Sequence, residues 1–488
     1  MTFTNAMKYQ QNFTYTENGA LALRSSGSAL LDLFSTAGAF RGWMEQDIVL
    51  AFQKALIEDR NLAMRLAFWC RDIREGLGER SVGRILLKVL AVQESESLRQ
   101  YLDLIPEYGR WDDLLSLLDT PLKEDVLQLI RDQLAADVCS MQEGKTVSLL
   151  GKWLPGINAS SYKTRKLAKE ILTSLRMSEK DYRHTLAALR SYLNITEKNL
   201  SMKAYGRLCY PAVPSYAMHR CRKAFMRHDG ERFADYLQAV EEGRKAIRSS
   251  VLYPYDIVEK YLYTLSISDP VLEAQWKALP DFTEKENRIL VMADVSGSMF
   301  GRPMASAVGL AIYFAERAKG PFHNHFMTFS ERPQLVEIQG ATLFDRVNSV
   351  RNADWEMNTD LEAAFMLILK TAVQANLPQE ELPERLVIIS DMQFDSCVYG
   401  QGSLLTDEMK NRFARYGYTL PKLVFWNVNS RRSTYFANQD SENIILASGQ
   451  SASVFSSLCR SDALTPYEYM CSVLNSERYR NISIKPAV

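Results

Sequence analysis

Acidic and hydroxyl residues follow directly after an apolar run near the middle of the chain. The run reads RILVMADVSGSM from Arg288 to Met299, and its aliphatic residues give way abruptly to Asp294, Ser296 and Ser298. Such a run predicts a buried parallel strand that ends in a loop. Open α/β sheets bind ligands at the carboxyl ends of their strands. A carboxylate and two hydroxyls at that position form an oxygen-only site suited to Mg²⁺ or Mn²⁺.

Two later segments add polar groups to the same predicted edge. Asn358, Thr359 and Asp360 precede a helical run, so the Thr359 hydroxyl is a candidate either for a helix cap or for a metal ligand. The run LVIISD predicts a second buried strand, which ends in Ser390 and Asp391 and supplies another carboxylate. Taken alone, these segments predict an ordinary N-cap and a solvated strand end. Their order leaves room for a strand and helices between them, which favours one shared site.

The three segments together resemble the metal-ion-dependent adhesion site of von Willebrand factor A domains. The resemblance implies that the metal, Mg²⁺ or Mn²⁺, is held by Asp294, Ser296, Ser298, Thr359 and Asp391. It also implies that the hydroxyls contact the metal, that the aspartates bind directly or through water, and that a coordination place stays open for water or an acidic group of a partner. One departure is Asn358, which stands where many relatives have glycine.

Patterns of hydrolytic or metal-assisted catalysis are missing from the sequence. The loop after Asp294 is not a G-x-S-x-G nucleophile turn, and it lacks the second aspartate of an aspartyl-phosphate hydrolase. GLGERS lacks the lysine of a phosphate-binding loop, and the five histidines lack metal-ligand spacing. Seven cysteines form no C-x-x-C pair, which favours reduced thiols over structural zinc. We predict that the protein is not an enzyme.

The elements that position the site belong to a chain of several domains. Residues 1–27 are mixed in polarity and are expected to lie extended, whereas 28–264 contain a long series of short amphipathic helices. So many helices in series favour a HEAT-like α-helical-repeat solenoid or ring over a single bundle. Residues 265–286 read as a linker. Strands and helices alternate over 287–488, which predicts a doubly wound α/β domain. The resemblance of its metal site implies that this domain is of the von Willebrand A type.

A second resemblance covers most of the helical part. It rests on the segments NGALAL, LLDLFSTAGAFR, KALIEDRNLAMRLAFWCRDIREGLGER, IPEYGRWDDLL, KWLPG, DYRHTLAALR and VPSYAM. In this order they resemble the Ro autoantigen family, whose helical portion is the TROVE domain and which also carries a C-terminal von Willebrand A domain. GRWDDLL and the stretch from Arg71 to Arg80 are the most specific parts. The alternative for both is structural, as an ion-pair network and a helix start, and we favour it.

Charge is distributed unevenly although the net charge is zero. Residues 151–250 contain 20 lysines and arginines against 9 aspartates and glutamates, whereas 101–150 contain 4 against 10. A charge run is often only a solvated face, but an unbalanced basic surface favours a polyanionic partner. The candidate RNA-binding residues are Lys163, Arg165, Lys166, Lys169, Arg176, Arg183, His184, Arg190, Lys203, Arg207, Arg220, Arg222, Lys223 and Arg227.

The two resemblances together imply a Ro-like protein that holds small structured or misfolded non-coding RNA on its helical ring. Bases of a single-stranded tail are expected to stack on Tyr182, Tyr205 and Tyr216. A protein partner, such as an exoribonuclease, would use the A-domain metal. The alternative is a protein–protein adaptor without an RNA role, whose metal binds an acidic residue of an AAA+ ATPase or a phage component. The chain shows neither a signal peptide nor a membrane-spanning run, so we expect a cytoplasmic protein without a membrane partner.

Overall fold

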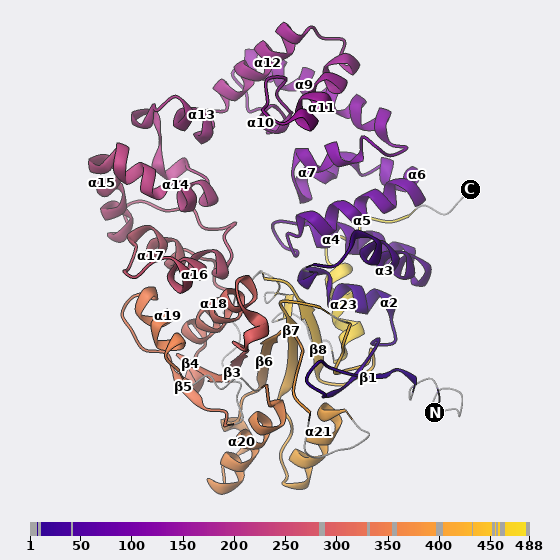
Figure 1. The fold of residues 1–488 in the computed structure, drawn as a ribbon, viewed down its shortest axis with the longest axis vertical. Helices are drawn as coiled ribbons and strands as arrows, with labels where there is room; N and C mark the ends of the chain where they lie inside the picture. Colours follow the sequence, from indigo (N-terminus) through magenta and orange to yellow (C-terminus); the bar gives the residue numbers. More distant parts are fainter. Residues whose placement is uncertain are drawn as a thin grey trace.

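A helical region is followed by a mixed six-stranded sheet with flanking helices, as Figure 1 shows. This arrangement confirms the predicted order of an all-α part and an α/β part. No helix among the described residues is long and apolar enough to cross a bilayer. The computed structural model describes residues 7, 11–40, 42–282, 288–328, 332–353, 359–396, 404–431, 433–450, 454, 457–458 and 464–484.

The helical region consists of short helices joined by turns. Several begin where a side chain caps the first turn: Ser28, Asp59, Ser161 and Ser178 each accept a hydrogen bond from a backbone N–H three residues on. The helices are α2 (Ala29–Phe34), α3 (Glu45–Glu58), α4 (Arg60–Arg71), α5 (Arg80–Gln93), α6 (Ser95–Arg99), α7 (Ile105–Tyr108), α8 (Trp111–Leu114), α9 (Lys123–Gln142), α10 (Leu150–Trp153), α11 (Tyr162–Ser174), α12 (Glu179–Tyr192), α13 (Thr196–Ser201), α14 (Ser215–His228), α15 (Gly230–Glu241), α16 (Pro254–Tyr263) and α17 (Pro270–Lys277).

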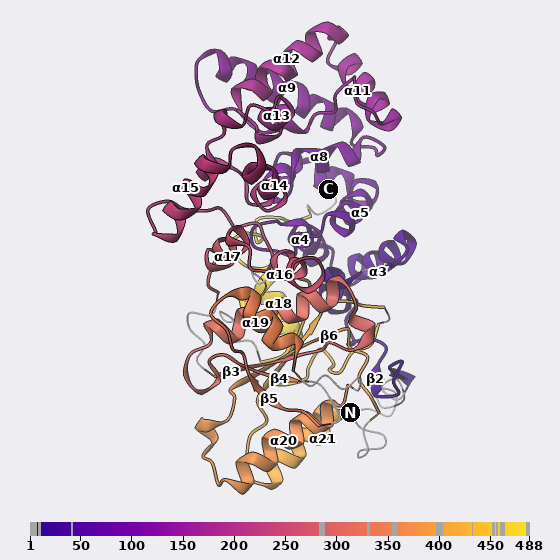
Figure 2. The ribbon, with the colours of Figure 1, turned by 60° about the vertical axis from the view of Figure 1, so that its left-hand side comes forward.

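The sheet has the strand order β5-β4-β3-β6-β7-β8, in which only β5 is antiparallel to its neighbour. Helices α18 and α19 lie on the side of the sheet toward the helical region, and α20 and α21 lie on the opposite side (Figures 1 and 2). The strands are β3 (Ile289–Ala293), β4 (His325–Thr328), β5 (Leu335–Glu337), β6 (Arg385–Ser390), β7 (Lys422–Asn427) and β8 (Ile444–Ser448). The helices are α18 (Arg302–Arg317), α19 (Leu343–Arg351), α20 (Leu361–Gln374), α21 (Leu405–Arg415) and α23 (Pro466–Leu474).

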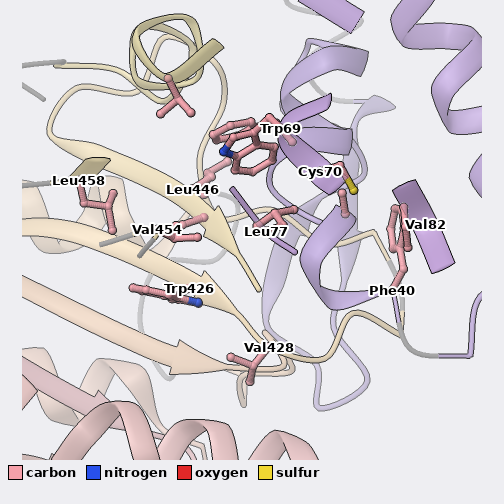
Figure 3. Close-up of a cluster of buried hydrophobic side chains, with 14 of the residues drawn as sticks. Phe40, Trp69, Cys70, Leu77, Val82, Trp426, Val428, Leu446, Val454 and Leu458 are labelled. Atoms are coloured by element: carbon pink, nitrogen blue, oxygen red, sulfur yellow. The ribbon is translucent and has the colours of Figure 1, made fainter. Parts of the chain in front are cut away.

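The helical region forms an arc that starts and ends on the α/β domain (Figure 1). At its start, the ring of Phe34 stacks on Trp69 of α4 at 4.3 Å and meets the edge of Tyr469 of α23 at 5.8 Å. Figure 3 shows Trp69 and Leu77 of the helical region beside Leu446 of β8 in one buried cluster. The apolar core is therefore continuous from the first helices into the sheet.

A close backbone contact completes this first junction. Gly38 donates its N–H to the Oγ of Ser448, the last residue of β8, at 3.0 Å. A Cβ on Gly38 would lie 2.5 Å from the Cα of Gly449, so no larger residue fits there.

The end of the arc is held by α16 and α17, which corrects the predicted linker. Asp269 caps α17 inside the segment 265–286, and the buried Trp276 donates its indole N–H to Glu316 of α18 at 2.9 Å. The Glu273 carboxylate accepts the N–H of Leu343 at 2.7 Å, at the start of α19, where the helix dipole favours an anion. The acidic and polar composition of this segment reflects capping contacts between the two parts of the chain.

The buried residues fall into two clusters of different size. The larger one runs through the first helices, the sheet and α16. The smaller one contains Leu208, Tyr210, Val213, Met218, Phe225, Phe233, Tyr236, Ile247 and Val271. Helix α17 contributes to both, because Val271 belongs to the small cluster whereas Leu272 and Trp276 belong to the large one.

The most specific sequence motifs of the helical region meet in a buried ion-pair network. Arg71 donates to Asp113 Oδ2 at 2.8 Å, and Arg84 donates to Asp113 Oδ1 at 2.6 Å. Arg80 pairs with Asp112 at the surface end of the network. The structural interpretation of these motifs is confirmed, because GRWDDLL supplies the carboxylates and the stretch that begins at Arg71 supplies cations.

The neighbouring carboxylate, Asp72, joins the helical region to the far end of the chain. Asp72 is fully buried and accepts hydrogen bonds from Arg478 Nη2 at 2.9 Å and from the Tyr479 hydroxyl at 2.8 Å. Tyr108 stacks under the Arg478 guanidinium, 4.6 Å from ring centroid to Cζ, and donates its hydroxyl to the Arg478 carbonyl. The hydrogen bond to Asp72 raises the pKa of Arg478 above its ordinary value, so the guanidinium stays charged.

We predict that Asp72→Ala destabilises the protein by about 3–5 kcal/mol, because it removes the hydrogen-bonded partner of Arg478 at a mostly buried junction and leaves only the more distant Glu107 at 3.9 Å. Urea denaturation followed by circular dichroism measures the loss. Asp119→Ala is the matched control, since Asp119 pairs with Lys88 on the surface and its loss should cost less than about 1 kcal/mol. Equal midpoints for the two variants would contradict the importance of the junction.

Candidate metal centre

Two buried carboxylates follow adjacent parallel strands at one edge of the sheet. Asp294 comes directly after β3, and Asp391 comes directly after β6. Ser390 connects them, because its hydroxyl donates to Asp294 Oδ2 at 2.7 Å. Strand β4 lies on one side of β3 and strand β6 lies on the other. The direction in which the chain adds strands to the sheet therefore reverses at β3. Such a switch point is where open α/β sheets bind ligands.

The loop after Asp294 turns its two serine hydroxyls toward each other. The Ser296 N–H donates to Asp294 Oδ1 at 2.8 Å, which bends the loop back over the strand end. The hydroxyls of Ser296 and Ser298 lie 3.1 Å apart. Arg431 donates to the Ser298 carbonyl at 2.9 Å and holds this loop from the β7 side. Three oxygen-bearing side chains therefore converge from one short loop.

Thr359 belongs to the same site and is not a helix cap. The cap of α20 is Asp360, whose Oδ1 accepts the Ala363 N–H at 2.8 Å. Thr359 is buried, and its hydroxyl lies 3.0 Å from the Gln393 carbonyl in the loop that begins at Asp391. Its N–H donates to Asp395 Oδ2 at 2.6 Å. Asn358, the predicted departure from the family pattern, lies outside the described residues.

The arrangement fits a hard cation by the chemistry of its donors. Asp391 Oδ2 is buried and has no hydrogen-bond partner within the described part of the chain. A buried carboxylate oxygen without a partner is costly unless a cation or water satisfies it. The described residues contain no group of three His, Cys, Asp or Glu side chains that could hold a metal. Metal binding here would depend on hydroxyl oxygens beside the two carboxylates, which suits Mg²⁺ or Mn²⁺ rather than zinc.

Burial makes both carboxylates difficult to ionise without a cation. Burial raises the pKa of Asp294, and the nearby Asp395 adds to this effect. Burial and then the charge of Asp294 raise the pKa of Asp391 to about 6, with a partial offset from Ser298 and Arg431. A bound divalent ion would reverse the direction of both shifts.

Several residues of the site were not predicted from sequence. They are Asn18, whose amide reaches the Thr359 hydroxyl at 3.3 Å, together with Ser390, Gln393, Asp395 and Arg431. Asp395 has a sequence signal, because it is the second acidic residue of the strand-end segment SDMQFD. Asn18 has none, since 341 positions separate it from Thr359.

The basic residues predicted to bind RNA divide into two groups. Three make internal contacts: Arg165 donates to the Ala159 and Ser160 carbonyls, Arg190 to the Gly151 and Leu154 carbonyls, and Arg222, only 8% exposed, to Asp269. These three stabilise turns and α17. Eleven are exposed, namely Lys163, Lys166, Lys169, Arg176, Arg183, His184, Lys203, Arg207, Arg220, Lys223 and Arg227.

Six of the exposed cations form two stripes at helical spacing. Lys163, Lys166 and Lys169 share one face of α11, and Arg220, Lys223 and Arg227 share one face of α14. Lys169 lies 3.6 Å from Glu179, whereas the other members of the stripes have no ion pair among the described residues.

The prediction of three stacking tyrosines was wrong in part. Tyr182 is fully buried and donates its hydroxyl to the Pro155 carbonyl at 2.9 Å, so it belongs to the core. Tyr205 already stacks on His228 at 4.8 Å between ring centroids. Tyr216 is exposed on α14 beside the second stripe. The helical spacing of Tyr182 placed it on the inner face of α12, as for other apolar residues of that helix.

We predict that Asp391→Asn stabilises the metal-free protein near neutral pH. A folded-state pKa of about 6 lies above the ordinary value of 3.8, so protonation of Asp391 stabilises the fold. That contribution is complete below 3.8 and is lost as the pH rises through 6. In chelator at about pH 7.5 the neutral variant should gain on the order of 2 kcal/mol over wild type. The gain should shrink at about pH 4.5.

Urea denaturation at the two pH values measures this difference. Asp440→Asn, which removes an exposed carboxylate before β8, is the control for a general effect of charge. A gain of equal size for Asp391→Asn at both pH values would contradict the assignment of a buried, repelled carboxylate.

Comparison with known proteins adds two family models and one relative. Residues 119–288 match a model described as Domain of unknown function (DUF2828), and residues 288–477 match one described as Domain of unknown function (DUF7788). The boundary between them falls immediately before β3, where the sheet begins. The chain is also similar to Uncharacterized protein L728 of Acanthamoeba polyphaga mimivirus, at 29% identity over 502 residues, which cover 95% of this chain and 87% of that protein.

Proposed function

We propose that the α/β domain is a von Willebrand A-type domain that binds Mg²⁺ or Mn²⁺ and uses the metal to hold a protein partner. The observation that carries this proposal is the meeting of Asp294 and Asp391 at the switch point of the sheet, with one Asp391 oxygen buried and unpartnered in the described structure. Ser296, Ser298 and Thr359 supply the remaining oxygens. An octahedral ion bound by these groups keeps a place for an acidic side chain from a partner.

We further propose that the helical region is a Ro-like solenoid, closed by the α/β domain, that holds structured non-coding RNA. Support comes from the two exposed basic stripes on α11 and α14, whose cations form no ion pair within the described residues except that of Lys169 with Glu179. Exposed cations in rows can neutralise phosphates of a nucleic acid backbone and release its counterions. The RNA would gain sequence-tolerant contacts from exposed aromatics such as Tyr216.

An adaptor without RNA is the second candidate. It is favoured by Phe300, which is 76% exposed directly after the metal loop and lies 5.7 Å from the Tyr263 ring. An exposed aromatic residue beside a cation site is suited to an acidic partner loop with an apolar neighbour. The adaptor would use the same metal and would leave the basic stripes without a ligand.

Metal binding should raise the thermal midpoint of the wild-type protein, because a bound ion stabilises only the folded state. We expect a higher midpoint in millimolar Mg²⁺ than in chelator, and no difference for Asp294→Ala. Asp407→Ala is the control, since Asp407 is an exposed carboxylate of α21 outside the site. A full Mg²⁺ response in Asp294→Ala would exclude this site as the place of binding.

RNA binding should depend on the α11 stripe. Replacing Lys163, Lys166 and Lys169 by Glu should weaken binding of a structured RNA with a single-stranded end and should flatten its salt dependence. Arg165 is left intact because it holds the turn before α11. The matched control replaces three exposed cations of the α/β domain, Lys370, Lys410 and Arg415, by Glu.

Fluorescence anisotropy across a salt series measures both effects. The thermal midpoint of the α11 variant should stay close to that of wild type, which separates lost binding from lost folding. If wild type has no affinity for RNA at about 50 mM salt, where counterion release favours binding, the adaptor replaces the RNA-binding proposal.

A further inference from the structure

The N-terminal hairpin lies directly on the loop that carries Asp391. The hairpin pairs β1 (Phe13–Tyr15) with β2 (Leu21–Leu23), and its turn covers residues 16–20. Thr16 donates its hydroxyl to the Phe394 carbonyl at 2.7 Å, and the Glu17 N–H donates to the Gln393 side chain at 2.8 Å. A segment expected from sequence to be merely extended therefore forms one wall of the site.

Two further contacts fasten the turn to the end of the same loop. The Ser396 N–H donates to the Asn18 carbonyl at 3.1 Å, and Gly19 forms an isolated antiparallel bridge with Asp395. Gly19 has a φ of +89°, and a Cβ there would lie 3.4 Å from Ser396. The N-terminal turn, which is remote in sequence, thus contacts the loop 391–396 along most of its length.

Asn18 contacts Thr359, one of the proposed metal ligands. Its amide Nδ2 donates to the Gln393 carbonyl at 2.7 Å and lies 3.3 Å from the Thr359 hydroxyl oxygen. Thr359 in turn donates its own proton to the Gln393 carbonyl at 3.0 Å. A hydroxyl oxygen has two lone pairs. With its proton directed to Gln393 and one lone pair used by Asn18, the oxygen keeps one lone pair for a cation.

The backbone of the loop explains why such support is needed. Met392, between Asp391 and Gln393, has a φ of +63°, in the left-handed region that non-glycine residues rarely adopt. A conformation of this kind persists only where surrounding contacts hold it. The hairpin supplies those contacts from one side, and Ser390, whose hydroxyl accepts the Met392 N–H at 3.0 Å, supplies one from the other.

We infer that the turn 16–20 is a positioning element of the metal site, in which Asn18 orients Thr359 and the whole turn holds the Asp391 loop. This inference rests on the proposed metal function. The docked turn holds Thr359 and the Asp391 loop in the arrangement that the metal would need. Metal binding therefore favours docking of the hairpin, and docking favours metal binding by the same free energy. Partners that orient metal ligands typically change metal affinity by about 10- to 100-fold when removed.

The test compares Asn18→Ala with Asn12→Ala in the full-length protein. Asn12 lies on the same segment and also bonds backbone through its side chain, to Ser25, but it does not touch the site. The Mg²⁺ concentration that gives half of the maximal rise in thermal midpoint should increase about 10-fold or more in Asn18→Ala. It should stay at the wild-type value in Asn12→Ala. A purely structural role would lower the chelator midpoint and leave the Mg²⁺ half-point unchanged.

A second variant and a second readout keep the outcomes distinct. Thr16→Val is nearly isosteric and removes the bond to Phe394, so it should also raise the Mg²⁺ half-point. Proteolysis between Asn12 and Ser28 should be slower with Mg²⁺ than with chelator in wild type, and equal in Asp294→Ala. No Mg²⁺ response in wild type overturns the metal proposal itself. A wild-type response that Asn18→Ala and Thr16→Val share unchanged overturns only the role of the turn.

Discussion

The pairing of Asp72 with Arg478 and Tyr479 is the interaction on which the architecture depends. A carboxylate with no exposure to water needs a cation or several donors close by. Asp72 finds both in residues 406 and 407 positions later in the chain. The adjacent Arg71 satisfies Asp113 in the same way. Two neighbouring positions at the end of α4 thereby connect the early helices to one another and to the last segment of the chain.

The junction at the end of the arc also attaches the helical region to the α/β domain, but through different contacts. The ring of Trp276 is buried and its N–H donates to Glu316, while Glu273 caps the start of α19. Between the two junctions the helices of the arc pack on one another, and its two ends also meet directly where the Tyr253 hydroxyl donates to the Leu77 carbonyl at 3.5 Å. The sheet serves as the base to which both ends of the arc are attached. The site at β3 and β6 lies on that base, so the geometry of its loops depends on a framework that both junctions stabilise.

Residue patterns predicted the two strands that end before Asp294 and Asp391 and placed five residues of the candidate site at or near their ends, because strand ends followed by small polar residues are local signals. They did not predict Asn18, whose role comes from tertiary contact alone. The amphipathic spacing that defined α12 also placed Tyr182 inside, although tyrosine alone suggested a stacking surface. The composition of residues 265–286 led to a wrong prediction of a linker. Asp269 and Glu273 are polar residues typical of a linker, but here they cap helices. Arg222 shows the same limit, since the sequence shows its charge but not its burial or its ion pair with Asp269.

The division of the core into two clusters gives the arc an uneven stiffness. The small cluster around Tyr210, Phe225 and Phe233 excludes far less apolar surface from water than the large one, and opening free energy follows such burial. We therefore expect thermal fluctuations to concentrate in the sector from α13 to α15, with α17 as its fixed end. The α14 basic stripe belongs to this sector, whereas the α11 stripe does not. Motion of the sector would therefore change the distance between the two rows of charge.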